Sequence, residues 1–350
     1  VSISNPFDNT RTVQIATNAI QELSVVSGTF NAEYGNALSG VVNTVTKEGG
    51  SNYNGYISFY TGDHLSPRDE TFFNVDEVDP LNNYVAEATL GGPIPFSGNN
   101  VTFFASGRYD NDRGWLFGKR QHTVFDSVFK STSNPDDIRI SSTGDGAIVP
   151  MNPSEEYSGT VKFTIKPFKA VKINYDVLYS NSEYQIYSHA LKYVPDANYT
   201  RYEWGLLNSL EVSHALNSKT FYNVKASYNL NDYKRYLYPL LDSDGDPVNY
   251  YPGLDVNDYF IDQRYQPIHK TVRPGPVAYT FRVGGTQNGH FYQRSATWSG
   301  KFDLTSQVTT EHEVKFGASL RSHDMQFEDF EIKRDTVVFL EPTIQDVTSH

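Results

Sequence analysis

Through most of this chain, apolar and polar side chains alternate at every second position. In residues 295–305 the even positions include Trp298 and Phe302, whereas the odd positions include Lys301 and Asp303. Successive side chains of a β-strand point to opposite faces, so each such segment has one apolar and one polar face. The pattern predicts strands rather than helices.

The same alternation, with varying regularity, recurs along the chain after residue 50. It predicts nine strands, at residues 53–61, 84–90, 101–109, 160–166, 171–179, 201–213, 222–230, 295–305 and 313–323. Their polar faces carry many charged side chains. These are Lys162, Lys172, Glu211, Lys225, Lys301, Asp303, Lys315 and Arg321. Such a face is typical of a hydrated interior.

The connections between these strands alternate between long and short. The long ones are predicted at about residues 62–82, 111–156, 182–200 and 234–290, and the others have about ten residues or fewer. Transmembrane β-barrels have short turns at one end and long loops at the other. The asymmetry therefore favours a membrane barrel, and a large β-sandwich or propeller stays open as the alternative.

Composition narrows the possible classes further. The mean hydropathy is -0.51, which argues against membrane-spanning helices, while 25 Tyr and 22 Phe are many for so polar a chain. A lipid-facing surface with aromatic girdles would account for them. The formal charge of -12 and the lack of basic runs exclude nucleic acid as a partner. The absence of Cys excludes disulfide scaffolds and thiol chemistry.

The first fifty residues have a different character. Two short apolar strand signals, at residues 20–26 and 41–45, flank a stretch containing Gly28 and Gly35, and a hinge-like Lys47–Gly50 follows. A mixed unit of this size is too small to fold alone. We expect it to pack inside something larger.

Residues 27–47, which read SGTFNAEYGNALSGVVNTVTK, resemble the end of the plug domain of TonB-dependent outer-membrane receptors. Gly55, the stretch Leu90–Ile94 and the pair Phe103-Phe104 resemble the first barrel hairpin of the Oar-like, carboxypeptidase-regulatory-like subgroup of Bacteroidota and related phyla. The resemblance implies an all-β fold: part of an antiparallel transmembrane barrel of about 22 strands with a plug in its lumen.

On that resemblance, residues 1–50 form the C-terminal part of the plug and residues 51–350 form the first nine barrel strands. The chain would then be a fragment of a longer receptor. The plug motif residues have a structural role, since glycines allow tight turns and close backbone approach. They are Gly28, Tyr34, Gly35, Gly40 and Asn43.

The family resemblance also implies a function. Such receptors sit in the bacterial outer membrane, in contact with lipid and lipopolysaccharide. They bind a ligand at the outer loops and plug, and import it when TonB pulls on a region upstream of this sequence. Siderophores, peptides, oligosaccharides and proteins are all possible ligands. The resemblance does not support a surface lipoprotein lid.

Two sets of loop residues are candidate sites. Trp115, Phe117, Tyr250 and Tyr251 are candidate ligand contacts, because rigid aromatic side chains offer a large contact area. Asp242, Asp244 and Asp246 are spaced as in calcium loops, but the sequence departs from an EF-hand. A looser calcium site and a solvated acidic turn both stay open, and no other cofactor is expected.

No catalytic residues are expected, because the Ser, His and Asp residues show no local catalytic signature. The chain is therefore interpreted as a non-enzyme. Two alternatives to the transporter remain: an adhesive or structural outer-membrane barrel that imports nothing, and a soluble β-rich binding domain.

Overall fold

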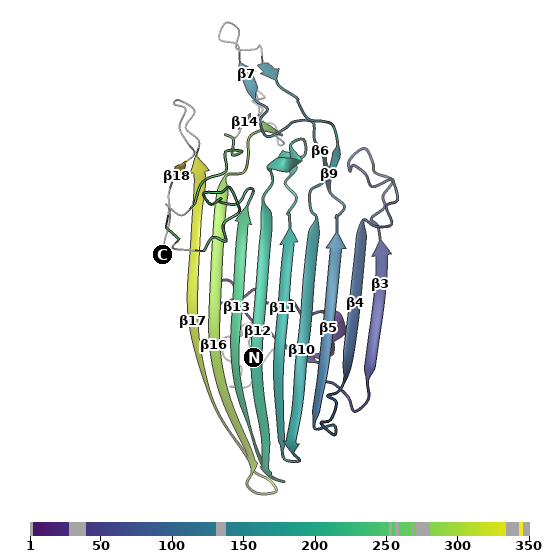
Figure 1. The fold of residues 1–350 in the computed structure, drawn as a ribbon, viewed down its shortest axis with the longest axis vertical. Coiled ribbons are helices and arrows are strands. Elements are labelled where there is room, and N and C mark those ends of the chain that lie inside the picture. The colour runs from purple at the N-terminus through teal and green to yellow at the C-terminus, as the bar shows by residue number, and fades with distance from the viewer. Residues whose placement is uncertain are drawn as a thin grey trace.

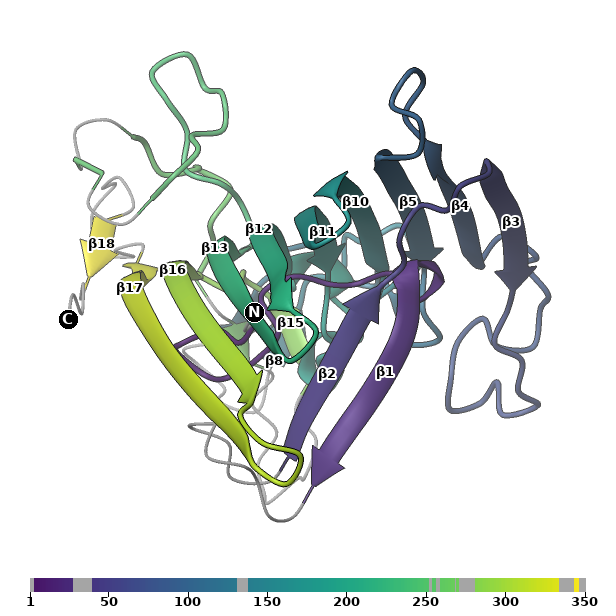
Figure 2. The same cartoon turned by 90° about the horizontal axis from the view of Figure 1, so that it is seen from below.

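The computed structural model of the protein describes residues 3–27, 40–130, 138–251, 254–255, 259–267, 269–270, 281–333 and 343–345. One tall, curved antiparallel sheet dominates these residues (Figure 1). Seen along the strands, the sheet is an arch with a concave inner face and a convex outer face (Figure 2).

Each long strand of the main sheet pairs with the next long strand in the chain. The sheet runs in the order β18-β17-β16-β13-β12-β11-β10-β5-β4-β3. Its strands are β3 (Asn54–Gly62), β4 (Asn83–Pro93), β5 (Val101–Asp112), β10 (Ser154–Phe168), β11 (Val171–Tyr184), β12 (Thr200–Asn217), β13 (Thr220–Tyr236), β16 (Gly289–Gln307), β17 (Glu313–Lys333) and β18 (Thr343–Gln345). The nine predicted strands are confirmed, and the three-residue β18 is an addition.

Most long strands extend beyond the residues predicted for them. β16 has 19 residues and β17 has 21, whereas a tilted strand crosses a membrane with about 9–11. The excess lies largely at the end of the sheet that carries the long connections, here called the loop end (Figure 1). Backbone pairing continues there although the apolar and polar alternation weakens, so the sequence pattern alone underestimated the strand lengths.

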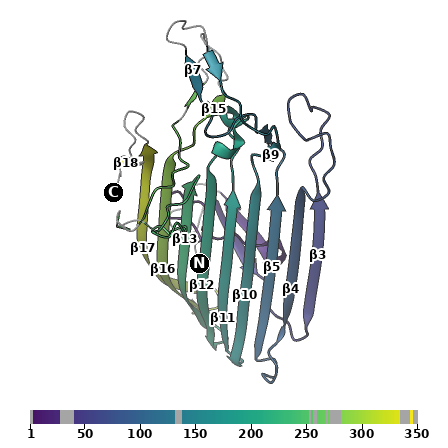
Figure 3. The ribbon, with the colours of Figure 1, turned by 45° about the horizontal axis from the view of Figure 1, so that its top comes forward.

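The long connections contain short elements of their own. These are β6 (Phe117–Lys119), β7 (Val128–Lys130), β8 (Ile138–Ile140), β9 (Ile148–Pro150), η2 (His189–Leu191), η3 (Pro195–Ala197), β14 (His269–Lys270) and β15 (Arg282–Gly284). β6 pairs with β9, β7 with β8 and β14 with β15. They lie together beyond the loop end of the main sheet (Figure 3).

The N-terminal residues lie on the concave side of the sheet. A short helix η1 (Thr17–Ala19) leads into a hairpin of β1 (Ile20–Ser27) and β2 (Gly40–Thr46), which crosses the hollow of the arch (Figure 2). The residues before the hairpin pack on the sheet. Val13 contacts Leu178 and Leu207, which places the side chains at positions 178 and 207 on the inner face.

The pairing register then assigns every other side chain to a face. Lys162 is paired with Asp176, and Glu211 with Lys225, all on the inner face. Outer-face positions carry an aromatic row across neighbouring strands. Tyr84, Tyr109 and Tyr157 have ring centroids 5.8 and 4.6 Å apart in succession. The polar inner face and the aromatic outer face of the sheet agree with the two faces predicted from the alternation of apolar and polar side chains.

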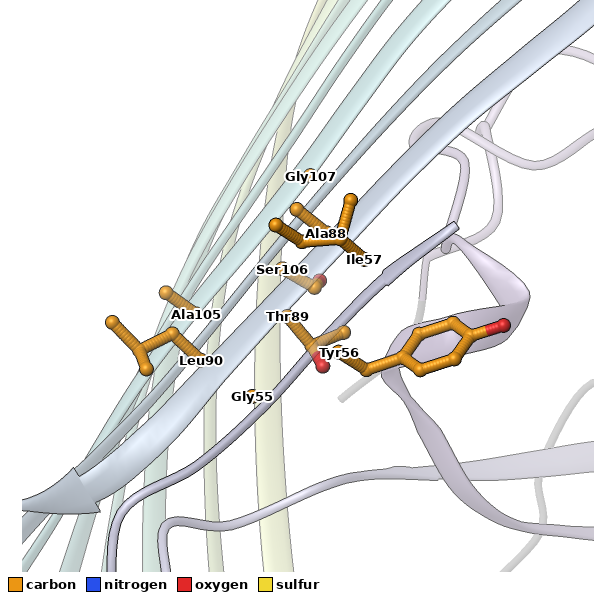
Figure 4. Close-up of a pocket in the computed structure, with 9 residues that line it drawn as sticks. All are labelled: Gly55, Tyr56, Ile57, Ala88, Thr89, Leu90, Ala105, Ser106 and Gly107. Carbon is orange, nitrogen blue, oxygen red and sulfur yellow. The ribbon is translucent and has the colours of Figure 1, made fainter. Parts of the chain in front are cut away.

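The outer face of β3, β4 and β5 is indented where its side chains are small. An open hollow of about 610 Å³ lies over Ala88, Ala105 and Gly107, with Ile57 and Leu90 at its rim (Figure 4). Ile57 is 83% exposed. Among the described residues, no helix is long and apolar enough to cross a membrane.

The N-terminal residues approach the sheet closely at Gly205 on β12. A β-carbon there would lie 2.1 Å from the carbonyl oxygen of Thr12. Gly205→Ala should therefore displace this segment, at a cost of about 1–3 kcal/mol. We expect trypsin to cut the full-length protein after Arg11 about tenfold faster, with the heat-modifiable mobility of the barrel unchanged.

The matched control is Gly107→Ala on the outer face. A β-carbon there would meet nothing within 4 Å, so the cleavage rate should stay that of the unmodified protein. Equal cleavage rates for the Gly205 and Gly107 variants would contradict the close contact.

Candidate functional site

The contact between residues 3–19 and the inner face of the sheet, here called the inner seam, combines apolar packing around Val13 and Ala19 with hydrogen bonds from polar side chains. The Asn5 side-chain amide donates to Asn231 Oδ1 at 3.3 Å. Asn229 Nδ2 donates to Thr12 Oγ1 at 2.7 Å, and Asn231 Nδ2 donates to the Thr12 carbonyl at 3.2 Å. Two asparagines of β13 thus hold one extended segment through its backbone and side chains.

Further contacts of the inner seam come from other strands. The backbone N–H of Gln14 donates to Ser180 Oγ on β11 at 3.0 Å. Phe7 meets Phe327 of β17 edge to face, with the centroids 6.0 Å apart. The segment therefore touches strands on both sides of the arch.

Three buried polar atoms in or beside the inner seam have no hydrogen-bond partner within the described part of the chain. They are Asn18 Oδ1, Ser106 Oγ on β5 and Ser158 Oγ on β10. Ser106 and Ser158 are 8% and 5% exposed. An unmet hydrogen bond of this kind costs about 1–3 kcal/mol. The seam is therefore less tightly bonded than a protein core.

An ionic cluster joins the end of β2 to the wall. Lys172 Nζ lies 2.8 Å from both carboxylate oxygens of Glu48, and Lys162 Nζ lies 3.3 Å from Glu48 Oε1. Lys162 is also 3.7 Å from Asp176, whose Oδ1 accepts a hydrogen bond from Thr46 Oγ1 at 3.1 Å. The cluster ties the hairpin to β10 and β11.

The charges of this cluster are balanced by each other. Burial alone would raise the pKa of Glu48, but the hydrogen bond from Lys172 and the positive charges of Lys162 and Lys172 outweigh it. The pKa of Glu48 therefore lies below its ordinary value, and the group is a carboxylate at neutral pH. Lys162 is only 6% exposed, so it depends on these acidic partners.

At the loop end, the long connections form one packed body. Val124 and Met151 of the loop between β5 and β10 pack with Leu191 and Val194 of the loop before β12. Gly285 before β16 donates its N–H to the Val124 carbonyl at 2.8 Å. Three connections far apart in sequence therefore hold one another in place.

Asp126 organises the loop between β5 and β10. Its carboxylate accepts from the backbone N–H of Thr123 at 3.0 Å, and from the N–H and hydroxyl of Thr143, both at 2.8 Å. Burial raises the pKa of Asp126, but these hydrogen bonds outweigh it and hold the pKa below its ordinary value. The side chain is 3% exposed, so its role is structural.

The four candidate ligand contacts differ in their exposure to solvent. Phe117 and Tyr250 are each 5% exposed, whereas Trp115 and Tyr251 are 43% and 50% exposed. Tyr250 packs on Tyr292 and Phe330 and donates a hydrogen bond to Glu328. The two buried rings stabilise loops, so only Trp115 and Tyr251 present a surface to a ligand.

The acidic turn closes on itself. Asp242 Oδ1 accepts from the backbone N–H groups of Asp244 and Asp246, both at 2.9 Å, and Gly245 has a φ of +85°. Within the described residues, no group of three or more acidic or imidazole side chains is arranged to hold a metal ion. The calcium site stays a prediction.

The residues of the plug motif are described only in part. Gly28, Tyr34 and Gly35 lie outside the described residues. Gly40 and Asn43 lie in β2, where they pair with Ser27 and Ser24 of β1. Both are exposed, and their part in forming the hairpin stays a prediction.

The sequence pattern indicates the charged side chains on the inner face of the strands, but it does not indicate most residues of the inner seam. Glu48 appeared only within a hinge, and Thr12, Asn229 and Asn231 had no signal beyond their polarity. The one available sign was the pair of asparagines two positions apart on a polar strand face. Such a pair is common on strands, so their partner could be found only in the folded chain.

No protein family model and no curated protein matches the chain. Among solved structures, it is similar to the outer membrane transporter YddB from Escherichia coli, with a TM-score of 0.56 and 11% identity, over 93% of this chain and 38% of that one. The chain has the fold of part of that transporter. It spans well under two thirds of the transporter's length.

A second solved structure is less similar. The siderophore receptor PirA from Acinetobacter baumannii has a TM-score of 0.45 and 12% identity, over 91% of this chain and 46% of that one.

Glu48→Gln tests the ionic cluster. The change keeps the side-chain shape but removes the charge facing two lysines, and we expect β2 to be held less firmly, by about 1 kcal/mol or more, because the buried Lys162 loses a partner. Hydrogen exchange of residues 40–48 should accelerate. In Glu22→Gln, at an exposed position of β1, the exchange should not change.

The same cluster predicts a pH dependence. Since the folded-state pKa of Glu48 is lowered, its contribution is present above its ordinary value of 4.5 and disappears as pH falls through the folded-state pKa. Exchange of β2 should accelerate over that range in the unmodified protein, and less so in Glu48→Gln. Identical pH profiles would contradict the assignment.

Asp126→Asn tests the loop body. The amide can no longer accept all three hydrogen bonds, so we expect a local loss of about 1–3 kcal/mol. Hydrogen exchange at Thr123 and Thr143 should accelerate by about tenfold or more. Asp69→Asn, at an exposed loop position, is the control and should leave both amides unchanged.

Proposed function

We propose that the protein is a TonB-dependent outer-membrane receptor that binds a ligand at its loops and imports it through the barrel. The observation that carries this proposal is the polar character of the inner seam and of the Glu48 cluster. Hydrogen bonds and ion pairs between such groups can be exchanged for bonds to water at a modest net cost. A segment held in this way can be pulled off the wall.

Two further observations support the proposal. The transporter-like fold provides a wall around a lumen, and residues 27–47 resemble the end of a receptor plug. In this proposal residues 1–50 belong to the plug and residues 51–350 to the barrel, within the Oar-like subgroup. TonB engages the receptor upstream of these residues.

The outer face supports a place in the outer membrane. The row of Tyr84, Tyr109 and Tyr157 lies on the outer face near the loop end, with the phenols of Tyr109 and Tyr157 donating to Glu155 at 2.8 and 2.7 Å. Amphipathic rings favour the level of lipid headgroups. We propose contact with lipid and lipopolysaccharide at this height, and ligand contact at Trp115 and Tyr251 beyond it.

Import is tested by comparing cells that express the full-length receptor with cells lacking it. Both are grown in a complex medium, and the compounds that disappear are measured by mass spectrometry. We expect at least one compound to be depleted only when the receptor is present, and depletion to stop when the proton-motive force is collapsed. A barrel that only adheres would reach the outer membrane and deplete nothing.

The role of the Glu48 cluster is tested by linking β2 to β11 beside it. The chain contains no Cys, so Thr46→Cys with Asp176→Cys can be joined by a short reversible thiol cross-linker. Depletion of the compound identified above should stop on cross-linking and return on reduction. Each single variant treated with the same reagent is the control, and unchanged depletion in the linked double variant would refute the movement.

A further inference from the structure

Two arginines face each other near the loop end of the inner face. Arg201 of β12 is paired directly with Arg235 of β13. Both lie on the inner face, because Gly205 and Asn231, at even spacings along the same strands, contact Thr12 there. Like charges directly opposite each other destabilise a sheet unless something of opposite charge lies between them.

Each guanidinium has a buried nitrogen without an acceptor among the residues that the structure describes. These atoms are Arg201 Nη1 and Arg235 Nε. A buried, charged donor left unpaired costs more than an ordinary unmet hydrogen bond. Two such donors on directly paired residues favour an anionic ligand between them.

Aromatic rings hold the arginines in position. The Arg235 guanidinium lies 5.2 Å from the ring centroid of Tyr199 and 5.5 Å from that of Phe291. Burial lowers the pKa of Arg282, whose guanidinium interacts electrostatically with Tyr199. Tyr199 is therefore a neighbour of both arginines. Its hydroxyl accepts the N–H of Gly289 at 2.9 Å, which fixes the ring.

The acidic groups nearby do not neutralise this cluster. Asp329 is 4.0 Å from Arg235 and 53% exposed, so it contributes a weak, solvated ion pair. Glu203 lies two positions along β12 from Arg201 and is within 3.4 Å of the side-chain amide of Asn231. Neither carboxylate accepts a hydrogen bond from the buried nitrogens of Arg201 and Arg235.

We propose that the directly paired Arg201 and Arg235 form a binding site for the oxyanion groups, carboxylate or phosphate, of the ligand that the receptor takes up. The inference rests on the proposed function, since it names the ligand chemistry of the same barrel. The planar fork of a guanidinium matches the paired oxygens of carboxylate and phosphate. The site lies next to the inner seam, where a bound anion would contact the wall just above the plug.

Calorimetric titration of the purified full-length protein, at low ionic strength in detergent, tests this site. The probes are tricarballylate, inorganic phosphate and the uncharged trimethyl ester of tricarballylate. We expect at least one oxyanion to bind, the ester not to bind, and binding to weaken as salt is added. The stronger of the two oxyanions indicates whether the ligand carries carboxylate or phosphate.

Arg201→Gln and Arg235→Gln should each weaken oxyanion binding by about tenfold or more. The matched control is Arg321→Gln, an exposed arginine on the inner face of β17 that is paired with Ser299, which should bind within about twofold of the unmodified protein. Binding of neither oxyanion, or equal binding by all three variants, would overturn the site. Compound depletion in cells would still test import, so the two proposals fail separately.

Discussion

The pairing register of the main sheet is the constraint on which every other feature depends. A shift of one residue in any strand would exchange its two faces. Lys162 and Asp176 would then face the outside, and their aromatic neighbours would face the hollow. The continuous pairing from β3 to β17 therefore places the ionic cluster, the inner seam and the arginine cluster on one face, and the aromatic row on the other.

The N-terminal residues bind to the inner face of the sheet. The hairpin and the segment before it are too small to have a core of their own, and their stability comes from the wall. Small apolar contacts at Val13 and Ala19 position the segment, while asparagines and ions supply most of the bonds. We interpret this mixture as a contact that is specific in place but not permanent, as the proposed import function requires.

The loops are stabilised by their own packing and hydrogen bonds. Val124, Met151, Leu191 and Val194 form a small core outside the barrel wall, and Asp126 closes the loop between β5 and β10 by accepting three hydrogen bonds. Burial of Phe117 and Tyr250 belongs to this packing. A loop aromatic is as readily used for loop stability as for ligand contact, and composition does not distinguish the two uses. The exposed Trp115 and Tyr251 are therefore better candidates for ligand contact.

The sequence by itself determined the strands, their two faces and the alternation of long and short connections, because period-two patterning is a local property of the backbone. It also placed Lys162, Lys172 and Arg321 on the polar face. Only the tertiary structure decided that Glu48 meets both lysines, that Asn229 and Asn231 hold Thr12, and that Arg201 lies opposite Arg235. Some of these contacts join residues more than two hundred positions apart. They depend on sheet curvature and register across several strands.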